Sequence, residues 1–109
     1  FILEIYKITQ KFPQSEIYGL TSQIRRSSVS VAANIAEGRG RQHTPEFIHF
    51  LHLSKGSLEE TKVYLNLSKD LNYITESEFV NLEKEFTEIG RMLSGLIKSL
   101  KNRRENTIA

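Results

Sequence analysis

Apolar residues recur along this chain at spacings of three and four, the period of α-helices that bury one face. In the first segment, residues 1–12, they fall at Phe1, Ile5, Ile8 and Phe12. Pro13 closes the segment, because the residue before a proline avoids the helical backbone conformation. The segment resembles the back half of a longer helix, so we expect the native N-terminus to precede Phe1.

A second helix is predicted from Ser15, a favourable N-cap residue, to Gly38. Its predicted core face carries Ile17, Leu20, Thr21, Ile24, Ser28, Val31 and Ile35. Small residues are frequent in it, namely Ser27, Ser28, Ser30, Ala32 and Ala33. Because small side chains shorten the distance at which helices pack, another helix is expected to approach closely. Gly38 is predicted to end the helix in the left-handed conformation and to open a loop over residues 38–41.

A third helix is predicted to begin with Thr44 as its N-cap, Pro45 as its first residue and Glu46 in its first turn. It should run to about Leu71, where Asn72 can take the left-handed conformation that ends a helix. The Pro45 position supports this start, since proline is tolerated in the first turn and excluded from helix interiors.

The fourth helix has the clearest start, because residues 75–78 (Thr-Glu-Ser-Glu) form a capping box. Ile74 and Phe79 around it are spaced as a hydrophobic staple. The apolar seam that follows alternates spacings of three and four, at Phe79, Leu82, Phe86, Ile89, Leu93, Leu96 and Leu100. Such a heptad stripe is typical of helices that pack at shallow angles. We expect the tail, residues 102–109, to fray.

Four helices with short connections predict an all-α protein, an antiparallel up-down-up-down four-helix bundle. The 109 residues have room for a single domain, 1–109. No cysteine is present, which excludes disulfides and thiolate metal sites and fits a reducing, cytoplasmic location. No apolar run of about 18 residues occurs, so no membrane span is expected.

The third helix carries a second apolar stripe on the side opposite its core face. Its members are Leu53, Tyr64, Leu67 and Leu71. A helix in a monomeric bundle needs only one stripe, so the second indicates a subunit interface. The alternative is that this helix is central in the bundle and meets two neighbours.

Charge is unevenly distributed, although the formal net charge is only +2. Residues 1–43 carry net +3, residues 44–97 carry net −4 and residues 98–109 carry net +3. This pattern indicates either an anionic partner or two surfaces that meet in an assembly. A solvated helical surface with no partner is the other interpretation.

Four arginines are the candidate binding residues. Arg25 and Arg26 flank the core position Ile24, and they either form ion pairs with acids of the second and third helices or bind phosphate, which suits the planar guanidinium. Arg39 and Arg41 alternate with Gly38 and Gly40 in a predicted loop, with no acid directly adjacent to either arginine. In an up-down-up-down bundle they share one end with Lys98, Lys101, Arg103 and Arg104, and the two clusters can form one basic rim.

Catalytic and metal motifs are weak. Glu46 and His49 have the Glu-x-x-His spacing of di-iron bundles, but such a site needs a second copy of the motif, and the sequence has none. His43, His49 and His52 have no nucleophile at helical spacing, and the Gly-Arg-Gly-Arg segment lacks the Gly-Lys-Ser/Thr ending of a phosphate loop. We therefore expect no enzyme activity, no metal site and no cofactor.

Several motifs together resemble the 23S rRNA intervening-sequence, or four-helix bundle, protein family. They are Phe12-Pro13, residues 18–26, residues 34–38, residues 56–60 and Leu71-Asn72-Tyr73. The fourth helix matches in pattern only, and Ala32 stands where relatives often have proline. The resemblance implies a homopentameric ring. The family is also similar to the accessory variability determinant of diversity-generating retroelements, a basic pentamer that binds nucleic acid and a reverse transcriptase.

These observations give two hypotheses for function. The first is a non-enzymatic homo-oligomer that binds RNA or DNA through Arg25, Arg26, Arg39 and Arg41. The alternative is a scaffold or accessory subunit that docks on another protein, such as a reverse transcriptase. The net charge is lower than the resemblance to a strongly nucleic-acid-binding protein implies.

Overall fold

The computed structural model describes the backbone of residues 1–108 and the side chains of residues 1–104. It contains α1 (Ile2–Thr9), a 3-10 turn η1 (Gln14–Glu16), α2 (Leu20–Arg39), α3 (Thr44–Asp70) and α4 (Glu76–Ile108). Over this range there is no strand, so the prediction of an all-α chain with four helices is confirmed. α4 continues through Asn102, where fraying was predicted; Ala109 lies outside the described residues.

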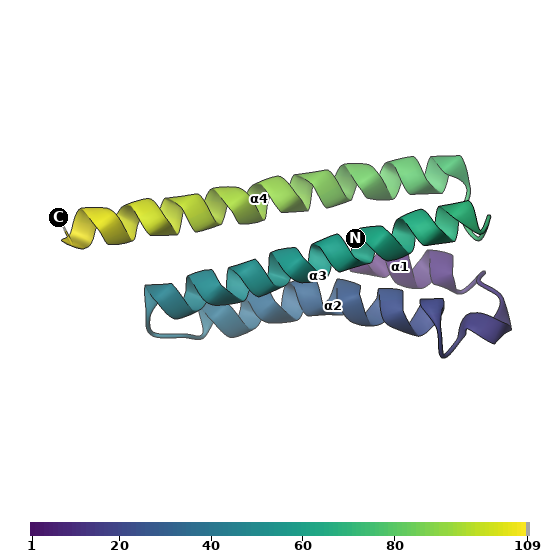
Figure 1. The fold of residues 1–109 in the computed structure, drawn as a ribbon, viewed down its shortest axis with the longest axis horizontal. Coiled ribbons are helices and arrows are strands. Elements are labelled where there is room, and N and C mark those ends of the chain that lie inside the picture. Colours follow the sequence, from purple (N-terminus) through teal and green to yellow (C-terminus); the bar gives the residue numbers. More distant parts are fainter. Residues whose placement is uncertain (109) are drawn as a thin grey trace.

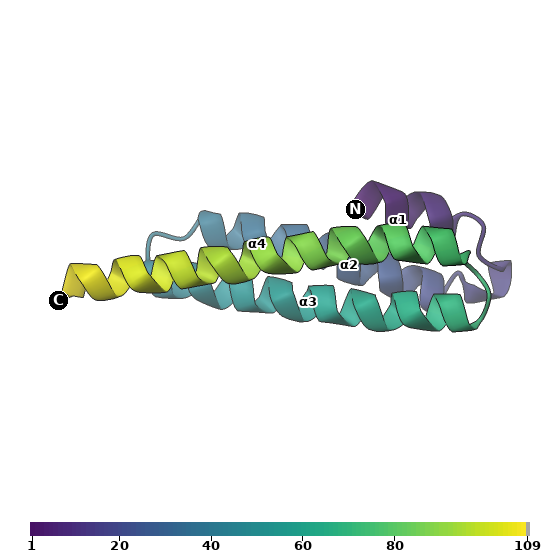
Figure 2. The same ribbon diagram turned by 90° about the horizontal axis from the view of Figure 1, so that it is seen from above.

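The three long helices lie side by side in a molecule of 54 × 24 × 18 Å (Figure 1). Successive helices run in opposite directions, and the short α1 lies beside only one half of α2 and α4 (Figures 1 and 2). In both views α4 projects beyond the loop that joins α2 to α3. We call the end with this loop, residues 40–43, the loop end, and the end with the α3–α4 connection, residues 71–75, the turn end.

The α3–α4 connection follows the sequence prediction closely. Asn72 has φ 62°, and the Tyr73 N–H donates to the Ser68 carbonyl at 2.9 Å, which closes α3 with a left-handed residue. In the capping box, the Thr75 N–H donates to Glu78 Oε1 at 2.9 Å and the Glu78 N–H donates to Thr75 Oγ1 at 3.1 Å. The Lys11 ammonium and this hydrogen bonding lower the pKa of Glu78.

The predicted boundaries of α1 and of the start of α2 are wrong. α1 ends at Thr9, and bonds from Lys11 and Phe12 to carbonyls three residues back tighten the chain into a turn. Ser15 lies in η1 and caps nothing; α2 begins at Leu20, whose N–H donates to Glu16 Oε1 at 3.3 Å. A carboxylate that reaches forward thus replaces the predicted serine cap.

The cap positions between α2 and α3 also differ from the prediction. α2 continues through Gly38 to Arg39, with Gly40 as its C-cap, and no glycine among the described residues has a positive φ. Gly38 is buried, and a Cβ on it would lie 2.8 Å from Phe50 Cβ and 2.9 Å from Phe47 Cδ1. Gly38 is therefore required for close contact with α3. The N-cap of α3 is His43 rather than Thr44.

A seam of small hydroxyl-bearing residues joins α2 to α3. Ser54 Oγ donates to the Val31 carbonyl at 2.7 Å, and Thr61 Oγ1 is 2.8 Å from Ser27 Oγ. Ser54 and Thr61 are fully buried. The prediction that small residues of the second helix admit a close neighbour is confirmed, and the hydroxyls satisfy one another inside the seam.

The buried face of α4 departs from the predicted stripe near its middle. Leu93, Ile97 and Leu100 are buried, whereas Leu96 is 37% exposed. α1 begins beside the middle of the long helices, so among the described residues no further helix lies beside the loop-end halves of α2 and α4 (Figures 1 and 2). α4 therefore buries the side that faces α3, and the predicted core position Leu96 borders an open groove.

Candidate nucleic-acid and subunit interfaces

The two halves of the bundle carry opposite charge. Ser30 Oγ bonds to Ser57 Oγ, and Gly90 faces the Leu58 side chain, which together mark the middle of the molecule. On the loop-end side, residues 31–57 and 91–104 contain eight Lys/Arg and two acids, net +6. On the turn-end side, residues 1–30 and 58–90 contain seven Lys/Arg and ten acids, net −3. We call these the basic half and the acidic half; the modest net charge hides this separation.

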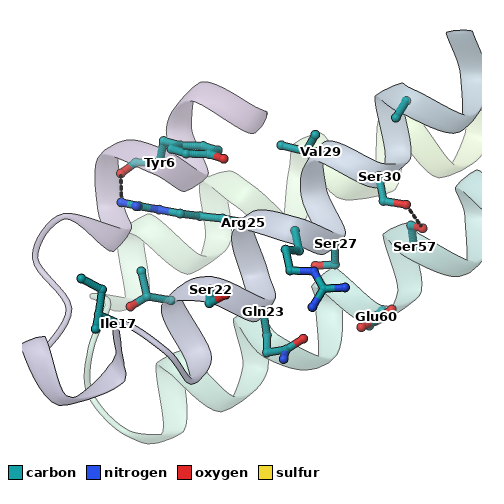
Figure 3. Close-up of a pocket in the computed structure, with 13 residues that line it drawn as sticks. Tyr6, Ile17, Ser22, Gln23, Arg25, Ser27, Val29, Ser30, Ser57 and Glu60 are labelled. Carbon is teal, nitrogen blue, oxygen red and sulfur yellow. Dashed lines mark hydrogen bonds between the residues drawn. The ribbon is translucent and has the colours of Figure 1, made fainter.

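Arg25 holds α1 against α2. Its Nε donates to Thr9 Oγ1 at 2.8 Å, and its Nη2 donates to the Tyr6 carbonyl at 3.4 Å (Figure 3). The guanidinium also lies over the Tyr6 ring, 4.7 Å from its centroid. Two of its donors and one face of the guanidinium are thus used within the fold, and its partners are a hydroxyl, a carbonyl and a ring rather than the predicted acids.

Arg26 lies in the acidic half and is exposed. It lines a groove of about 690 Å³ between α1, α2 and α3. Gln23 and Glu60, labelled in Figure 3, line the same groove. Within the described side chains it makes no hydrogen bond or ion pair. Glu60 accepts a hydrogen bond from the Tyr64 hydroxyl at 2.9 Å, and this bond raises the pKa of Tyr64.

Arg39 and Arg41 lie at the loop end, where they were predicted. Arg41 Nη2 donates to Glu37 Oε1 at 2.6 Å, and its guanidinium lies 4.9 Å from the Phe50 ring centroid. Arg39 is exposed and has no hydrogen bond or ion pair to the part of the chain that is described. Arg39 is fourteen residues from Arg25, about 21 Å along the helix axis. The four predicted arginines therefore form two separate groups, not one cluster.

A second basic surface lies in a groove between α3 and α4 in the basic half. The groove has a volume of about 390 Å³ and is lined by His52, Lys55, Ser94, Ile97, Lys98, Lys101 and Asn102. We call it the lysine groove. Sequence reasoning included Lys98 and Lys101 in a basic rim but missed His52 and Lys55. The available signal was the acid-free segment 47–58, which carries both on one helix.

The predicted second stripe of α3 is open to solvent in the single chain. Leu53 is 43% exposed, and Leu67 and Leu71 are each 44% exposed. Tyr64 differs, because it is half-buried against the core near the turn end. Val63, at 62% exposure, is a further apolar residue on the surface of α3 that the sequence reading did not select. A neighbouring helix of the same chain therefore does not cover these three leucines.

An apolar groove of about 750 Å³ runs between α2 and α4 beyond the start of α1. Ile35, Ile89 and Leu96 line it, and Met92 at its edge is 72% exposed. The predicted seam position Leu96 thus borders this groove, while Ile89 both lines the groove and packs against the core, partly buried.

The described residues offer neither a metal-binding cluster nor a membrane-spanning helix. Among residues 1–104, no three His, Asp or Glu side chains are grouped closely enough to hold a metal ion. No helix over the described range combines the length and the apolar character that a membrane span requires.

Comparison with known proteins places these features in a family. Residues 1–95 match the model of a family described as 23S rRNA-intervening sequence protein. The fold is similar to the crystal structure of a protein of unknown function from the S23 ribosomal protein family of Bacteroides thetaiotaomicron, with a TM-score of 0.78 and 30% sequence identity. That match covers 89% of this chain and 88% of the other. No functionally curated protein matches the chain.

Proposed function

Since this chain belongs to the 23S rRNA-intervening sequence protein family, we propose that it is a non-enzymatic helical bundle that assembles with copies of itself and binds the phosphate backbone of RNA or DNA. The observation that carries the proposal is the separation of charge along the bundle, with net +6 in the half that includes the loop end. A polyanion gains most of its affinity from phosphate neutralisation and release of its counterions. The basic half supplies that attraction, and the acidic half gives the encounter a direction.

Of the four predicted arginines, we assign contact with nucleic acid to Arg39 and Arg41. Arg39 has an unpaired guanidinium, the group best suited to bidentate contact with phosphate. Arg41 is held near it through Glu37 and the Phe50 ring. Arg25 instead serves the packing of α1, and Arg26 is surrounded by the negative charge of the acidic half.

We predict that wild-type protein binds fluorescently labelled RNA and DNA in an anisotropy titration, with affinity that falls as salt rises. Arg39→Ala should lower affinity about eightfold at 0.1 M salt, since one lost phosphate contact removes about 0.9 from the slope of log K against log salt. Arg26→Ala is the matched control, because it removes the same charge from an exposed, unpaired position of the same helix, and its effect should stay below about twofold. Absence of binding at low salt would refute the proposed function.

The self-assembly that we propose uses the exposed leucines of α3. A subunit interface would cover Leu53, Leu67 and Leu71, which α1, α2 and α4 leave open. In a ring whose axis lies parallel to the bundles, all basic halves point the same way. A weak local field is then repeated around one rim, which increases avidity for a long polyanion. We propose that the homopentameric ring implied by the family resemblance is arranged in this way.

We predict that Leu67→Glu reduces the solution mass from a multiple of 12.6 kDa to that of one chain, as measured by light scattering. A buried carboxylate without a partner would oppose association strongly. Met92→Glu is the control for an added acid on a different exposed apolar side chain and should leave the mass unchanged. A wild-type mass of one chain, or an unchanged mass in Leu67→Glu, would contradict this interface.

A protein-binding scaffold is the second candidate function, and the apolar groove between α2 and α4 favours it. Such docking would depend on apolar area rather than on phosphate contacts, and its affinity would change little with salt. The anisotropy titration separates the two functions, because a scaffold without a nucleic-acid role gives no signal change at any salt concentration.

A further inference from the structure

The geometry of the lysine groove points to a second contact surface, beyond the predicted arginines. We propose that this groove binds the phosphodiester backbone of a nucleic acid strand and that it does so without contacting the bases. The inference rests on the proposed function and names the site and the chemical group that is bound.

Both walls of the groove contribute lysines. α3 supplies Lys55, with the His52 imidazole beside it on the same wall, and α4 supplies Lys98 and Lys101. The buried side chain of Ile97, 5% exposed, lies between the walls and keeps the two helices together. A strand that lies along the groove would therefore have ammonium groups on both sides.

The lysines of the groove are not used by the fold. Lys55, Lys98 and Lys101 form no ion pair or hydrogen bond with the described residues. In the acidic half, by contrast, Lys11 pairs with Glu78, and Lys69 pairs with Glu76. The nearest acid on α3 is Glu59, one turn from Lys55, and no ion pair joins the two. The charge in the groove is thus available to an external anion.

The remaining lining residues indicate which part of a nucleic acid fits. Ser94 and Asn102 add neutral polar groups that can donate to phosphate or sugar oxygens. The groove contains no Phe, Tyr or Trp, and proteins that grip single-stranded bases do so by stacking them on such rings. Binding through the backbone alone would be tolerant of sequence and would not distinguish single strands by their bases. An acidic protein surface would contact the same lysines, and a wild-type protein that binds neither RNA nor DNA would point to that partner instead.

The test compares two double variants that lose the same charge. Lys98→Gln/Lys101→Gln removes two lysines from the groove; Lys7→Gln/Lys84→Gln removes two exposed, unpaired lysines from the acidic half. In anisotropy titrations with unrelated RNA and DNA sequences, the groove variant should lose about sixtyfold in affinity at 0.1 M salt, because its salt slope should fall by about 1.8. The control variant should lose less than about twofold. Lys55→Gln, on the opposite wall, should lower the slope by about 0.9.

The outcomes separate this inference from the proposed function. If wild-type protein binds and Arg39→Ala weakens binding, but the groove and control variants behave alike, the groove is not the contact and the proposed function stands. If wild-type protein binds neither RNA nor DNA, both are refuted, and an acidic protein becomes the partner to seek for these lysines. A strong preference for one sequence that survives Lys98→Gln/Lys101→Gln would also overturn the groove as the main contact.

Discussion

Gly38→Ala is expected to destabilise the bundle by about 1–3 kcal/mol, although alanine is the better helix former. The new methyl group would lie 2.8 Å from Phe50 Cβ, 2.9 Å from Phe47 Cδ1 and 3.3 Å from the Phe47 carbonyl oxygen. A Cβ and a backbone carbonyl cannot move aside as the tip of a long side chain can. α2 and α3 must therefore separate at the loop end, and the contacts next to Gly38 are lost with them.

Two other helical glycines supply the control for Gly38. A Cβ on Gly56 or on Gly95 would meet nothing within 4 Å. Gly56→Ala and Gly95→Ala should each stabilise the protein by about 0.5–1 kcal/mol through helix propensity alone. Urea unfolding followed by far-UV circular dichroism, at one protein concentration because self-association also adds stability, gives all three values. A Gly38→Ala variant as stable as wild type would show that α2 and α3 are less closely packed than described.

Ser54→Leu should destabilise the protein by about 3 kcal/mol or more, the largest effect we expect from a single substitution. Ser54 is fully buried in the α2–α3 seam, and its hydroxyl donates to the Val31 carbonyl. The space opposite is occupied by the backbone of α2, so a leucine side chain has no volume to enter. Because the contact is with backbone, the added volume cannot be accommodated by a change of rotamer, and the two helices must move apart.

Ser54→Ala separates the hydrogen bond from the packing. It removes the hydroxyl without adding volume and should cost only about 0.5–1.5 kcal/mol. Unfolding curves of the two variants, with Ser94→Leu on the exposed surface of α4 as the control for an added leucine, test this ordering. Equal losses for alanine and leucine at position 54 would mean that the hydroxyl, and not the limited space, determines stability there.

The parts of the fold that the sequence predicts correctly are those that depend only on residues close together in the sequence. The capping box at Thr75 and Glu78 and the left-handed Asn72 need only side chains within a few positions, and both are present. Gly38 was misassigned because a glycine that ends a helix and a glycine that admits a neighbouring helix look alike in sequence. Only the position of Phe47 and Phe50 on α3 distinguishes them.

The candidate site shows the same division. That the region around Arg39 and Arg41 is basic is readable from the sequence; that Glu37, one turn before Arg41, pairs with it is seen only in the structure. The binding of Arg25 to α1 could not be predicted from the sequence. Its partners Thr9 and Tyr6 lie sixteen and nineteen residues before it, across a turn whose course was predicted wrongly. The lysine groove brings together two segments about forty residues apart, about 52–55 and 94–102, and their register depends on how α4 packs.

Because the two halves carry opposite charge, the acidic half of one copy can compete with nucleic acid for the basic half of another. Two copies that lie antiparallel place the acidic half of one against the basic half of the other, whereas copies that lie parallel repel at both ends. The attraction reaches about 10 Å at 0.1 M salt and farther as salt is diluted. At low ionic strength and high protein concentration, antiparallel pairs would therefore cover the lysines and arginines that a polyanion needs. The affinity for nucleic acid would then pass through a maximum at intermediate salt, instead of rising continuously as the salt concentration falls.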